Sequence, residues 1–432
     1  MNQSHQLPDP IQGTILFPPW LIAINDHPSV RRMMFIRQLG LKAYMNFPGA
    51  IHTRYSHALG TMQLAGNMVD MLSTKMKNKG KQFISQNLID NRNNVMAAGF
   101  LHDIGHAPFS HAADFVLKLI NGKTHEEMTE EIIRKKIPND IENWGITKSS
   151  VIQLIGPKSH SHPFLHQIID GPLDCDKLDY LLRDAYHVGL RYSFDLSHFL
   201  RSYTIIGSED DMPNCILGLD FTKQAVVTAE LFVVIWKSMY DLVYLIEQSR
   251  IAEKMLEKAF LLCATDTDIR QTFQLDAYVE ADDESMLSQL KKKGAEIVKL
   301  IAAENPRLLY VSKLDNELTK RNFRMSPEFL AKLEEDPDQL SEHLSLRLAE
   351  ELQQEKYSII CDIIKSRTPR RILLDHPTKA EYELRNESDI VDVIAAKNVI
   401  KVYISPTIER NIVNRNIKEK LKNLVKEETE FD

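Results

Sequence analysis

The sequence predicts a mainly α-helical protein, with a multi-helix core at residues 1–304 and a smaller α/β region at residues 305–432. Two observations support this fold class. Between about residues 28 and 270, apolar side chains recur with the period of a helix, and short breaks rich in Pro, Gly and polar residues separate the periodic runs. Beyond residue 304, short β-rich runs alternate with charged helical stretches.

Each expected element follows from its local pattern. HALGTMQLAGNMVDMLSTKM and TAELFVVIWKSMYDLVYLIEQSRIAEKML have helical periodicity, whereas ILFPPWL and CILGLDF are the strands expected within the core. In the C-terminal region, LLYVSKL and IKVYISP are expected as strands. The charged stretch from Glu334 to Ser366 is expected to form one long amphipathic helix, and IVNRNIKEKLKNLVKEE a closing helix.

The composition is that of a soluble globular protein. A net charge of −7 argues against a mainly electrostatic binder of nucleic acid, because such binding depends on neutralising phosphates. The four cysteines form no C-x-x-C pair, which favours a reducing, cytoplasmic location over a disulfide or zinc-ribbon framework. The N-terminus lacks the features of a signal peptide, and no apolar run is long enough for a membrane span.

All but two of the 15 histidines precede residue 200, so candidate chemistry is concentrated in the first half of the chain. The densest group lies in the string LHDIGHAPFSHAAD. Its adjacent His102 and Asp103 combine an imidazole with a carboxylate, a donor set that suits iron, manganese, zinc or magnesium. His106 is four residues after His102 and is expected on the same helix face. Gly105 and Pro108 are expected to end that helix.

Two flanking segments offer further ligands. HTRYSHALG places His57 at the head of a helix, with Arg54 one turn earlier on the same face. LDCDKLDYLLRDAYHVG aligns four titratable side chains along one helix stripe: Asp176, Tyr180, Asp184 and His187. A lone histidine in an apolar helix is usually structural, but three such segments in order indicate a functional site.

These segments resemble the HD-domain superfamily, whose H…HD…D signature is matched by His57, His102–Asp103 and Asp176. DPIQGTI, RQLGLKAYMNFPGAIHTRYSHALG, LHDIGHAPFSH and DCDKLDYLLRDAYHVGL are similar to the dNTP triphosphohydrolase branch of that superfamily, which holds the bacterial dGTPases and the vertebrate SAM- and HD-domain dNTPase. The similarity spans roughly residues 9–265. It implies a multi-helix HD-domain core that binds a divalent metal ion (Mn, Fe, Mg or Zn).

The resemblance also implies residue roles. The implied metal ligands are His57, His102, Asp103 and Asp176. The implied catalytic residues are His125, the Asp114 that orients it, and His106 beside the phosphates. The implied substrate contacts are Arg54, His111, Lys177 and Lys237 at the phosphates, Gln38 and Leu39 beside the sugar and base, Tyr180 and Asp184 at the deoxyribose, and Tyr244 against the 2′ position.

The expected function is metal-dependent hydrolysis of deoxynucleoside triphosphates to deoxynucleoside and triphosphate, in a homo-oligomer (dimer, tetramer or hexamer) such as the resemblance implies. Lys237 and Ile246 stand where the family has arginine and histidine, and Pro8 and Met34 replace polar residues of a regulatory nucleotide site. Two alternatives therefore stay open. One is an HD phosphohydrolase or nuclease acting on a nucleoside monophosphate, a cyclic nucleotide or single-stranded nucleic acid, and the other is a nucleotide-sensing protein without turnover.

Overall fold

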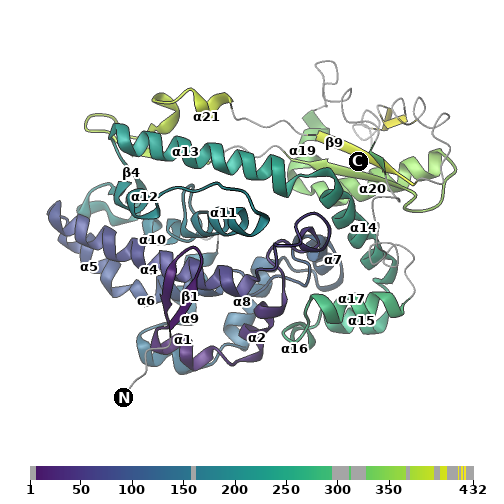
Figure 1. Ribbon diagram of the computed structural model, residues 1–432, viewed down its shortest axis with the longest axis horizontal. Helices are drawn as coiled ribbons and strands as arrows, with labels where there is room; N and C mark the ends of the chain where they lie inside the picture. Colours follow the sequence, from purple (N-terminus) through teal and green to yellow (C-terminus); the bar gives the residue numbers. More distant parts are fainter. Residues whose placement is uncertain are drawn as a thin grey trace. The chain divides into compact units, whose positions relative to one another are not determined.

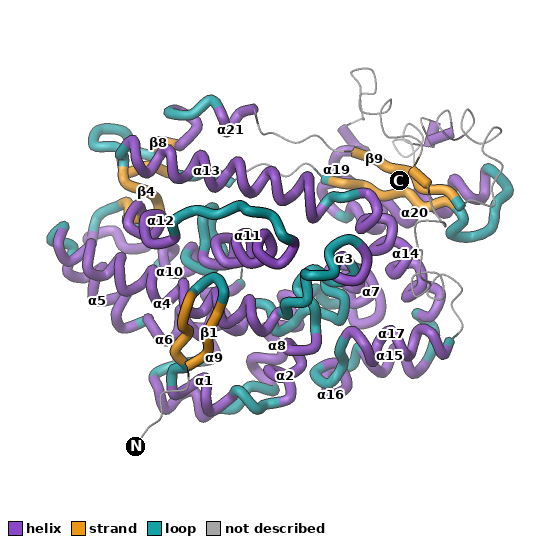
Figure 2. The backbone as a smooth tube through the Cα atoms, viewed as in Figure 1, coloured by secondary structure: helices purple, strands orange, loops and turns teal. Residues whose placement is uncertain are grey.

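The computed structural model describes residues 6–156, 162–293, 311–312, 327–365, 370–393 and 399–405, and positions 417, 420, 421, 423 and 424. These residues are mainly helical, as predicted (Figures 1 and 2). The chain divides into two compact units. The first unit comprises Met1–Val243, Arg270–Met286 and Pro369–Ile394, and the second comprises Tyr244–Ile269, Leu287–Thr368 and Ala395–Asp432. Each unit is thus assembled from three stretches, whereas the predicted division has a single boundary at residue 304.

The first unit is built around α4 (Arg54–Asn78), which packs against α5 (Gln82–Asp90), α6 (Arg92–Leu101) and α11 (Cys175–Val188). Other helices of this unit include α1 (Pro19–Ile24), α2 (Pro28–Arg31), η1 (Arg32–Phe35), α3 (Lys42–Met45), α7 (His111–Asn121), α8 (His125–Lys135), η2 (Asn139–Trp144), α9 (Lys148–Ile155), α10 (Pro163–Gln167), α12 (Leu196–Ser202), η3 (Glu209–Asn214), α13 (Lys223–Met239), α16 (Leu275–Tyr278), η6 (Leu384–Asn386) and α21 (Ile390–Val393). Three helices run across unit boundaries: η4 (Tyr240–Tyr244), α15 (Thr267–Thr272) and α17 (Asp283–Lys292). Within the described ranges, every helix is too short or too polar to span a bilayer.

Two small sheets complete the first unit. β1 (Gln6–Asp9) and β2 (Gly13–Leu16) form an antiparallel hairpin. The second sheet has the order β3-β4-β7-β8, from Tyr203–Ile206, Ile216–Asp220, Leu373–Asp375 and Tyr382–Glu383. The strand predicted at CILGLDF is therefore confirmed. The strand predicted at ILFPPWL is wrong beyond Leu16, because Pro19 occupies the first position of α1, where its fixed φ favours a helix start.

The second unit combines helices α14 (Glu247–Cys263), α19 (Pro327–Glu335) and α20 (Pro337–Glu351) with a sheet. The sheet has the order β5-β9-β6, from Val311–Ser312, Val399–Ile404 and Ile359–Ile364, and β6 pairs antiparallel with β9. The strands predicted at LLYVSKL and IKVYISP are confirmed at their described residues. Ile417, Leu421 and Leu424 pack into this unit's core, but most of the predicted closing helix lies outside the described residues.

The prediction of one helix from Glu334 to Ser366 is wrong. Pro337 begins a new helix with Asp336 as its N-cap, and α20 ends at Glu351. Gln353 and Tyr357 then adopt left-handed backbone conformations that turn the chain. The β-branched run that follows becomes β6, because it pairs with β9 along its whole length.

A buried ion pair joins α14 to β6 within the second unit. Asp362 on β6 is fully buried, and Arg250 of α14 donates to it from both Nε, at 3.1 Å, and Nη2. The Tyr403 hydroxyl donates a further hydrogen bond to Asp362 at 3.2 Å. Removing one member of a buried pair is costly, because the other charge is left without compensation.

We expect Arg250→Met to lower the stability of the second unit by about 3 kcal/mol, the lower end of the range for a broken buried pair, because Arg250 is partly exposed. Hydrogen exchange at the β6 amides and the thermal midpoint would measure the loss. The double variant Arg250→Met with Asp362→Leu should recover most of it, because neither member of the pair is then left buried without the other. An equal loss in both variants would contradict this account of the pair.

Candidate metal centre and active site

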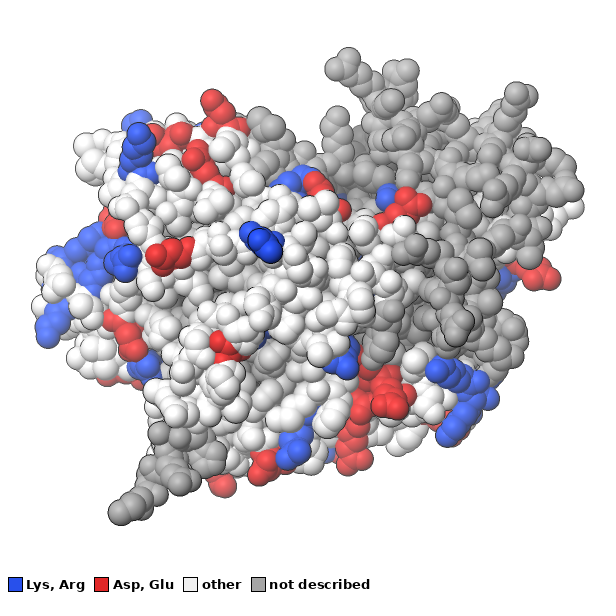
Figure 3. Space-filling model, in the orientation of Figure 1, with Lys and Arg blue, Asp and Glu red and all other residues white. Residues whose placement is uncertain are grey.

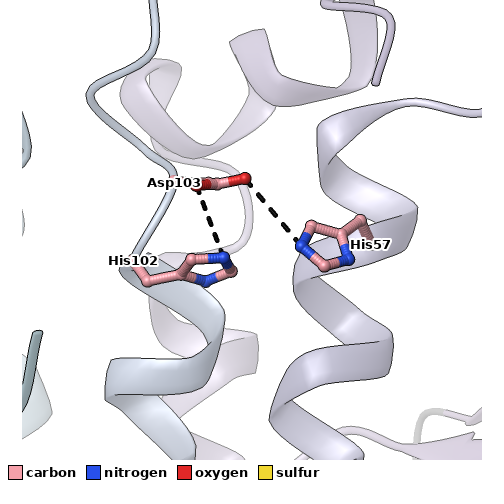
Figure 4. A group of neighbouring side chains, drawn as sticks. All are labelled: His57, His102 and Asp103. Atoms are coloured by element: carbon pink, nitrogen blue, oxygen red, sulfur yellow. Dashed lines mark ion pairs between the residues drawn. The ribbon is translucent and has the colours of Figure 1, made fainter. Parts of the chain in front are cut away.

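The four predicted metal ligands meet in the first unit. His57 lies in the first turn of α4, His102 and Asp103 directly follow α6, and Asp176 lies in the first turn of α11. His57 Nε2 is 3.0 Å from Asp176 Oδ1 and 3.9 Å from Asp103 Oδ2. His102 Nε2 is 3.4 Å from Asp103 Oδ1 and 3.5 Å from Asp176 Oδ1. Figure 4 shows His57 and His102, from separate helices, turned toward the same Asp103 carboxylate.

The donor atoms of this cluster fit a divalent metal ion. Among the described residues, the Nε2 atoms of His57 and His102 are buried and have no hydrogen-bond partner of good geometry. Their Nδ1 atoms are engaged, by Asp179 Oδ2 at 3.0 Å and by the Gly99 carbonyl at 2.9 Å. With a metal ion bound, each Nδ1 would keep the proton of a neutral imidazole, and each Nε2 would present its lone pair to the ion. A shared cation is what such a set of donors is suited to hold.

The pKa shifts of the cluster residues also fit a bound cation. Burial lowers the pKa of His57, but Asp176 and Asp179 outweigh burial and raise that pKa to about 10. Burial raises the pKa of Asp176, yet the two imidazoles hold it well below its ordinary value. The two carboxylates therefore attract positive charge to this point. A proton on His57 supplies that charge when no cation does, and a bound metal ion would displace the proton.

Asp179 is a functional residue that the sequence analysis missed. It is fully buried and accepts hydrogen bonds from His57 and from two nitrogens of Arg183, at 2.7 and 2.9 Å. Arg183 continues to Asp9, and Gln12 also donates to Asp179. A carboxylate behind a metal-binding histidine fixes its tautomer and ring orientation. The one sequence feature that could have drawn attention to Asp179 is its spacing from the other acidic residues of the same helix.

The close approach of α4 and α11 requires Gly60. A Cβ atom at Gly60 would lie 2.0 Å from Asp179 Oδ1 and 2.3 Å from Arg183 Nη2. Both distances are far below van der Waals contact. The hydrogen of glycine therefore leaves the space in which the Asp179–Arg183 pair reaches His57.

The segment after α6 departs from the predicted helix. The helix ends at Leu101, so the expectation that His102 and His106 share a helix face is wrong. Phe109 and Ser110 adopt left-handed backbone conformations, with φ values of 61° and 54°. Asp283 Oδ1 accepts from the Phe109 amide at 2.7 Å, which holds this turn from outside. Two successive non-glycine residues in that region are strained, as at many functional sites.

Beside the metal cluster lies the predicted proton-transfer group. His125 begins α8, and its Nδ1 is 3.3 Å from Asp114 Oδ2 on α7. The ring of His106 stacks on that of His125, with centroids 4.0 Å apart. His106 Nε2 is in turn 3.4 Å from Asp103 Oδ1, which links the group to the cluster. Gly105 allows this packing, because a Cβ there would lie 2.3 Å from the His125 carbonyl oxygen.

The two stacked histidines differ in ionisation. Burial lowers the pKa of His125, but Asp114 outweighs it and the pKa is raised. Burial, together with the Arg54 and His125 charges, holds the pKa of His106 well below its ordinary value. Adjacent groups whose pKa values are pushed apart are typical of acid–base assignments. His125 is thus the member of the pair suited to hold a transferable proton.

The predicted phosphate contacts near the cluster are held by acidic side chains. Arg54 is buried, donates from Nε to Ser110 Oγ at 3.0 Å and pairs with Asp103. Lys177 forms an ion pair with Asp174 one turn earlier on α11. His111 begins α7, but its side chain lies outside the described residues. Contact of these residues with phosphate stays a prediction.

The predicted sugar contacts follow the metal ligand along α11. The ring centroid of Tyr180 is 6.5 Å from that of His57. Asp184, one turn further on, is buried and lies 2.6 Å from His52 Nε2. The structure therefore extends the cluster into a row of polar side chains, and His52 is a member of that row which the sequence analysis did not select.

The other predicted substrate contacts do not form one group with the metal cluster. Leu39 and the Oε1 atom of Gln38 are buried in the segment between η1 and α3. Lys237 lies in the last turn of α13 and pairs with the exposed Asp241. Tyr244 is the first residue of the second unit. Substrate contact by these residues stays a prediction.

Comparison with known proteins agrees with this geometry. Residues 54–184 match the HD domain, and residues 215–429 match the HD-associated region. An uncharacterized protein of Methanocaldococcus jannaschii is 32% identical over 255 residues, covering 59% of this chain and 48% of that protein. The human deoxynucleoside triphosphate triphosphohydrolase SAMHD1 is 31% identical over 238 residues, covering 48% of this chain and 37% of that enzyme. The matched region thus spans about half or less of these relatives.

The chain carries an HD domain from Arg54 to Asp184, followed by the region associated with that domain. Among proteins with this domain it resembles the dNTP triphosphohydrolase branch, because SAMHD1 proteins of human and mouse are among its relatives at 31% and 32% identity. The His and Asp groups that could hold a metal ion fall within the matched domain.

We expect Gly60→Ala to weaken metal binding about 10- to 100-fold, because the added methyl group displaces Asp179 from His57. Calorimetric titration with Mn²⁺ would measure the affinity. Gly66→Ala on the same helix is the matched control, since its nearest neighbour is the flexible Met96 side chain at 3.1 Å. If both variants bound Mn²⁺ equally well, the outer carboxylate would have no part in ordering the site.

Proposed function

We propose that this protein hydrolyses deoxynucleoside triphosphates to deoxynucleoside and triphosphate. The observation that carries the proposal is the pairing of two groups: buried imidazole nitrogens that converge with Asp103 and Asp176, and a His125–Asp114 pair beside them. A nucleotide-sensing protein has no need of an oriented proton-transfer histidine. The relatives named as dNTP triphosphohydrolases support the choice of substrate.

The residues have distinct tasks in this reaction. His57, His102, Asp103 and Asp176 would hold a divalent ion, which would act as a Lewis acid that screens phosphate charge and increases the acidity of water. Water adds to the α-phosphorus while the bond from phosphorus to the 5′-oxygen breaks, and that oxygen must gain a proton as it leaves. His125 is placed to give the proton, because Asp114 orients its ring and raises its pKa.

Another phosphoester substrate is the main alternative. Lys237 is paired with Asp241 rather than held free for a terminal phosphate, and lysine lacks the bidentate fork of the arginine that it replaces. A nucleoside monophosphate, a cyclic nucleotide or single-stranded nucleic acid would need no such fork. The products distinguish the alternatives, because only the proposed reaction releases intact tripolyphosphate.

We expect the protein to release tripolyphosphate from dNTPs with Mn²⁺, Fe²⁺ or Mg²⁺. His125→Ala should lower kcat about 10²- to 10⁴-fold, because the leaving oxygen loses its proton donor, while Mn²⁺ binding is kept. His198→Ala, outside the site, is the matched control. Release of orthophosphate or shortened oligonucleotide instead would favour the alternative substrates, and tight dNTP binding without turnover would favour a sensor.

We also propose that copies of this chain associate through α13. Val227, Leu231 and Val234 are exposed apolar residues at spacings of four and three, which is the spacing of an interhelical seam. Antiparallel pairing with Leu231 opposite Val234 of a second copy would also bring Glu230 near Lys237. Lys237 would then serve assembly rather than substrate binding. In Figure 3 the middle of this view is mostly uncharged, and most of the charged side chains lie nearer its edges. The four free, buried cysteines support a reducing, cytoplasmic setting for this assembly.

We expect Leu231→Glu to shift the protein toward monomer, because it buries like charges in the antiparallel seam. Light scattering coupled to size-exclusion chromatography measures the mass across a dilution series. Ile89→Glu on α5 is the control, since Ile89 is an equally exposed apolar residue outside the stripe. A wild-type protein that is monomeric at all concentrations, or equal effects of both substitutions, would remove α13 as the interface.

A further inference from the structure

Asp283 is a buried carboxylate that belongs to neither the metal cluster nor the proton-transfer pair. It is the first residue of α17 and is 2% exposed, and it comes from a stretch of the first unit far along the chain from the HD residues. Its two oxygens accept from two backbone amides, Oδ1 from Phe109 at 2.7 Å and Oδ2 from Arg37 at 2.9 Å. Burying a carboxylate is costly, so a residue in this position calls for an explanation.

The two amides belong to segments that border the candidate active site. Phe109 lies in the strained turn after α6, and the next residue, Ser110, accepts at Oγ from Arg54 Nε at 3.0 Å. Arg37 forms an antiparallel bridge with Thr53, the residue before Arg54. Both segments therefore reach Arg54, the predicted phosphate contact that pairs with a metal ligand.

The two segments are also in direct contact. Gly40 has a left-handed backbone conformation with φ 48°, and a Cβ there would lie 3.1 Å from the Phe109 carbonyl oxygen, closer than ordinary van der Waals contact. The separation of the segments is thus closely set. Asp283 has one oxygen on each of them and joins the two.

The carbonyl side of the turn is held separately. Arg32 is buried and donates from Nη1 to the Ile104 carbonyl and from Nη2 to the His106 carbonyl, both at 3.0 Å. The Tyr278 hydroxyl donates to the Gly105 carbonyl at 2.7 Å. Loss of the carboxylate bonds would therefore free the far end of the turn without unfolding the rest of it.

We propose that Asp283 is a positioning residue that clamps the Arg37 segment to the Phe109 turn and so places Arg54 for the reaction. The role in a reaction rests on the proposed function, whereas the clamp rests on the contacts alone. A carboxylate offers an acceptor oxygen to each amide, but an Asn side chain of the same shape would turn its NH₂ group toward one of them. Asp283→Asn therefore opens one side of the clamp and keeps its volume.

The clamp is also sensitive to pH. Burial raises the pKa of Asp283 to about 6, although the two amides and the charge of Arg54 on α4 lower it. The other charged groups that face it are Arg32 of η1 and Asp282 on its own segment. Because the pKa is raised in the folded state, ionisation of Asp283 costs stability as the pH rises from about 4 to about 6, so the buried charge does not serve stability. Protonation removes the charge from both bonds and turns one acceptor into a hydroxyl, which makes the wild-type clamp similar to that of the Asn variant.

The test compares wild-type protein with Asp283→Asn and Asp282→Asn across pH at saturating Mn²⁺. We expect kcat/KM for a dNTP to be about 10-fold lower in Asp283→Asn at about pH 7.5, because a hydrogen bond to a charged group is lost. The difference should shrink toward none at about pH 5, where the wild-type carboxyl is protonated as well. The ratio of the two proteins at each pH cancels the titration of all other groups.

Asp282→Asn is the matched control. It removes the same charge one residue earlier, and Asn is an equally good acceptor for the Ser285 amide, which donates to Asp282 at 2.8 Å. A wild-type to Asp283→Asn ratio that stays constant over this pH range would show a merely structural role. An equal effect of the Asp282→Asn control would also overturn the proposal.

Hydrogen exchange separates this inference from the proposed function, because it needs no turnover. At about pH 7.5 the amides of residues 36–40 and 107–111 should exchange faster in Asp283→Asn than in the wild-type protein, and Asp282→Asn should match the wild type. If the wild-type protein hydrolyses no dNTP but exchange changes in this way, the proposed function fails and the clamp stands. Unchanged exchange in both segments would refute the clamp, even in an active enzyme. Thermal unfolding of each variant confirms that it is folded.

Discussion

The candidate site depends on one buried contact, the hydrogen bond between the Asp179 carboxylate and His57 Nδ1. It holds a ring proton on Nδ1, so that Nε2, which faces Asp103 and Asp176, would be the atom that binds a metal ion. A carboxylate is costly to bury alone, and Arg183 offsets that cost with two hydrogen bonds. The metal centre is therefore the inner end of a charge network that begins at the N-terminal hairpin.

Backbone geometry brings the chemical groups to this network. Gly60 lets α4 approach α11, and Gly105 lets the turn after α6 reach the start of α8. The same turn carries two residues with left-handed backbones, which Asp283 holds through the Phe109 amide. Helices supply the rigid parts of the site, and this strained turn supplies the change of direction that places His106 on His125.

The polar side chains divide into three regions with different chemistry. The metal cluster attracts positive charge, the His125–Asp114 pair retains a proton, and the His52–Asp184 pair is a buried imidazole–carboxylate contact. The three regions follow one another along α11 and the helices next to it. This order fits a ligand that has charged groups at one end and polar, uncharged groups at the other. The HD domain at residues 54–184 contains the first region. The other two regions contain the predicted proton-transfer pair and a predicted sugar contact.

The sequence by itself determined the fold class and singled out the four side chains that meet in the candidate metal centre, because the residue types that bind metals and the period of a helix are both local properties. It also placed His57 correctly at the head of its helix. Only the tertiary structure decided that α6 ends before His102, that β6 is a strand and that Asp179 and His52 face functional side chains. Each of these depends on partners distant in the chain: β9 for β6, α4 for Asp179 and α11 for His52. No local pattern specifies such partners, because their free energy comes from burial and hydrogen bonding between segments that meet only in the folded protein.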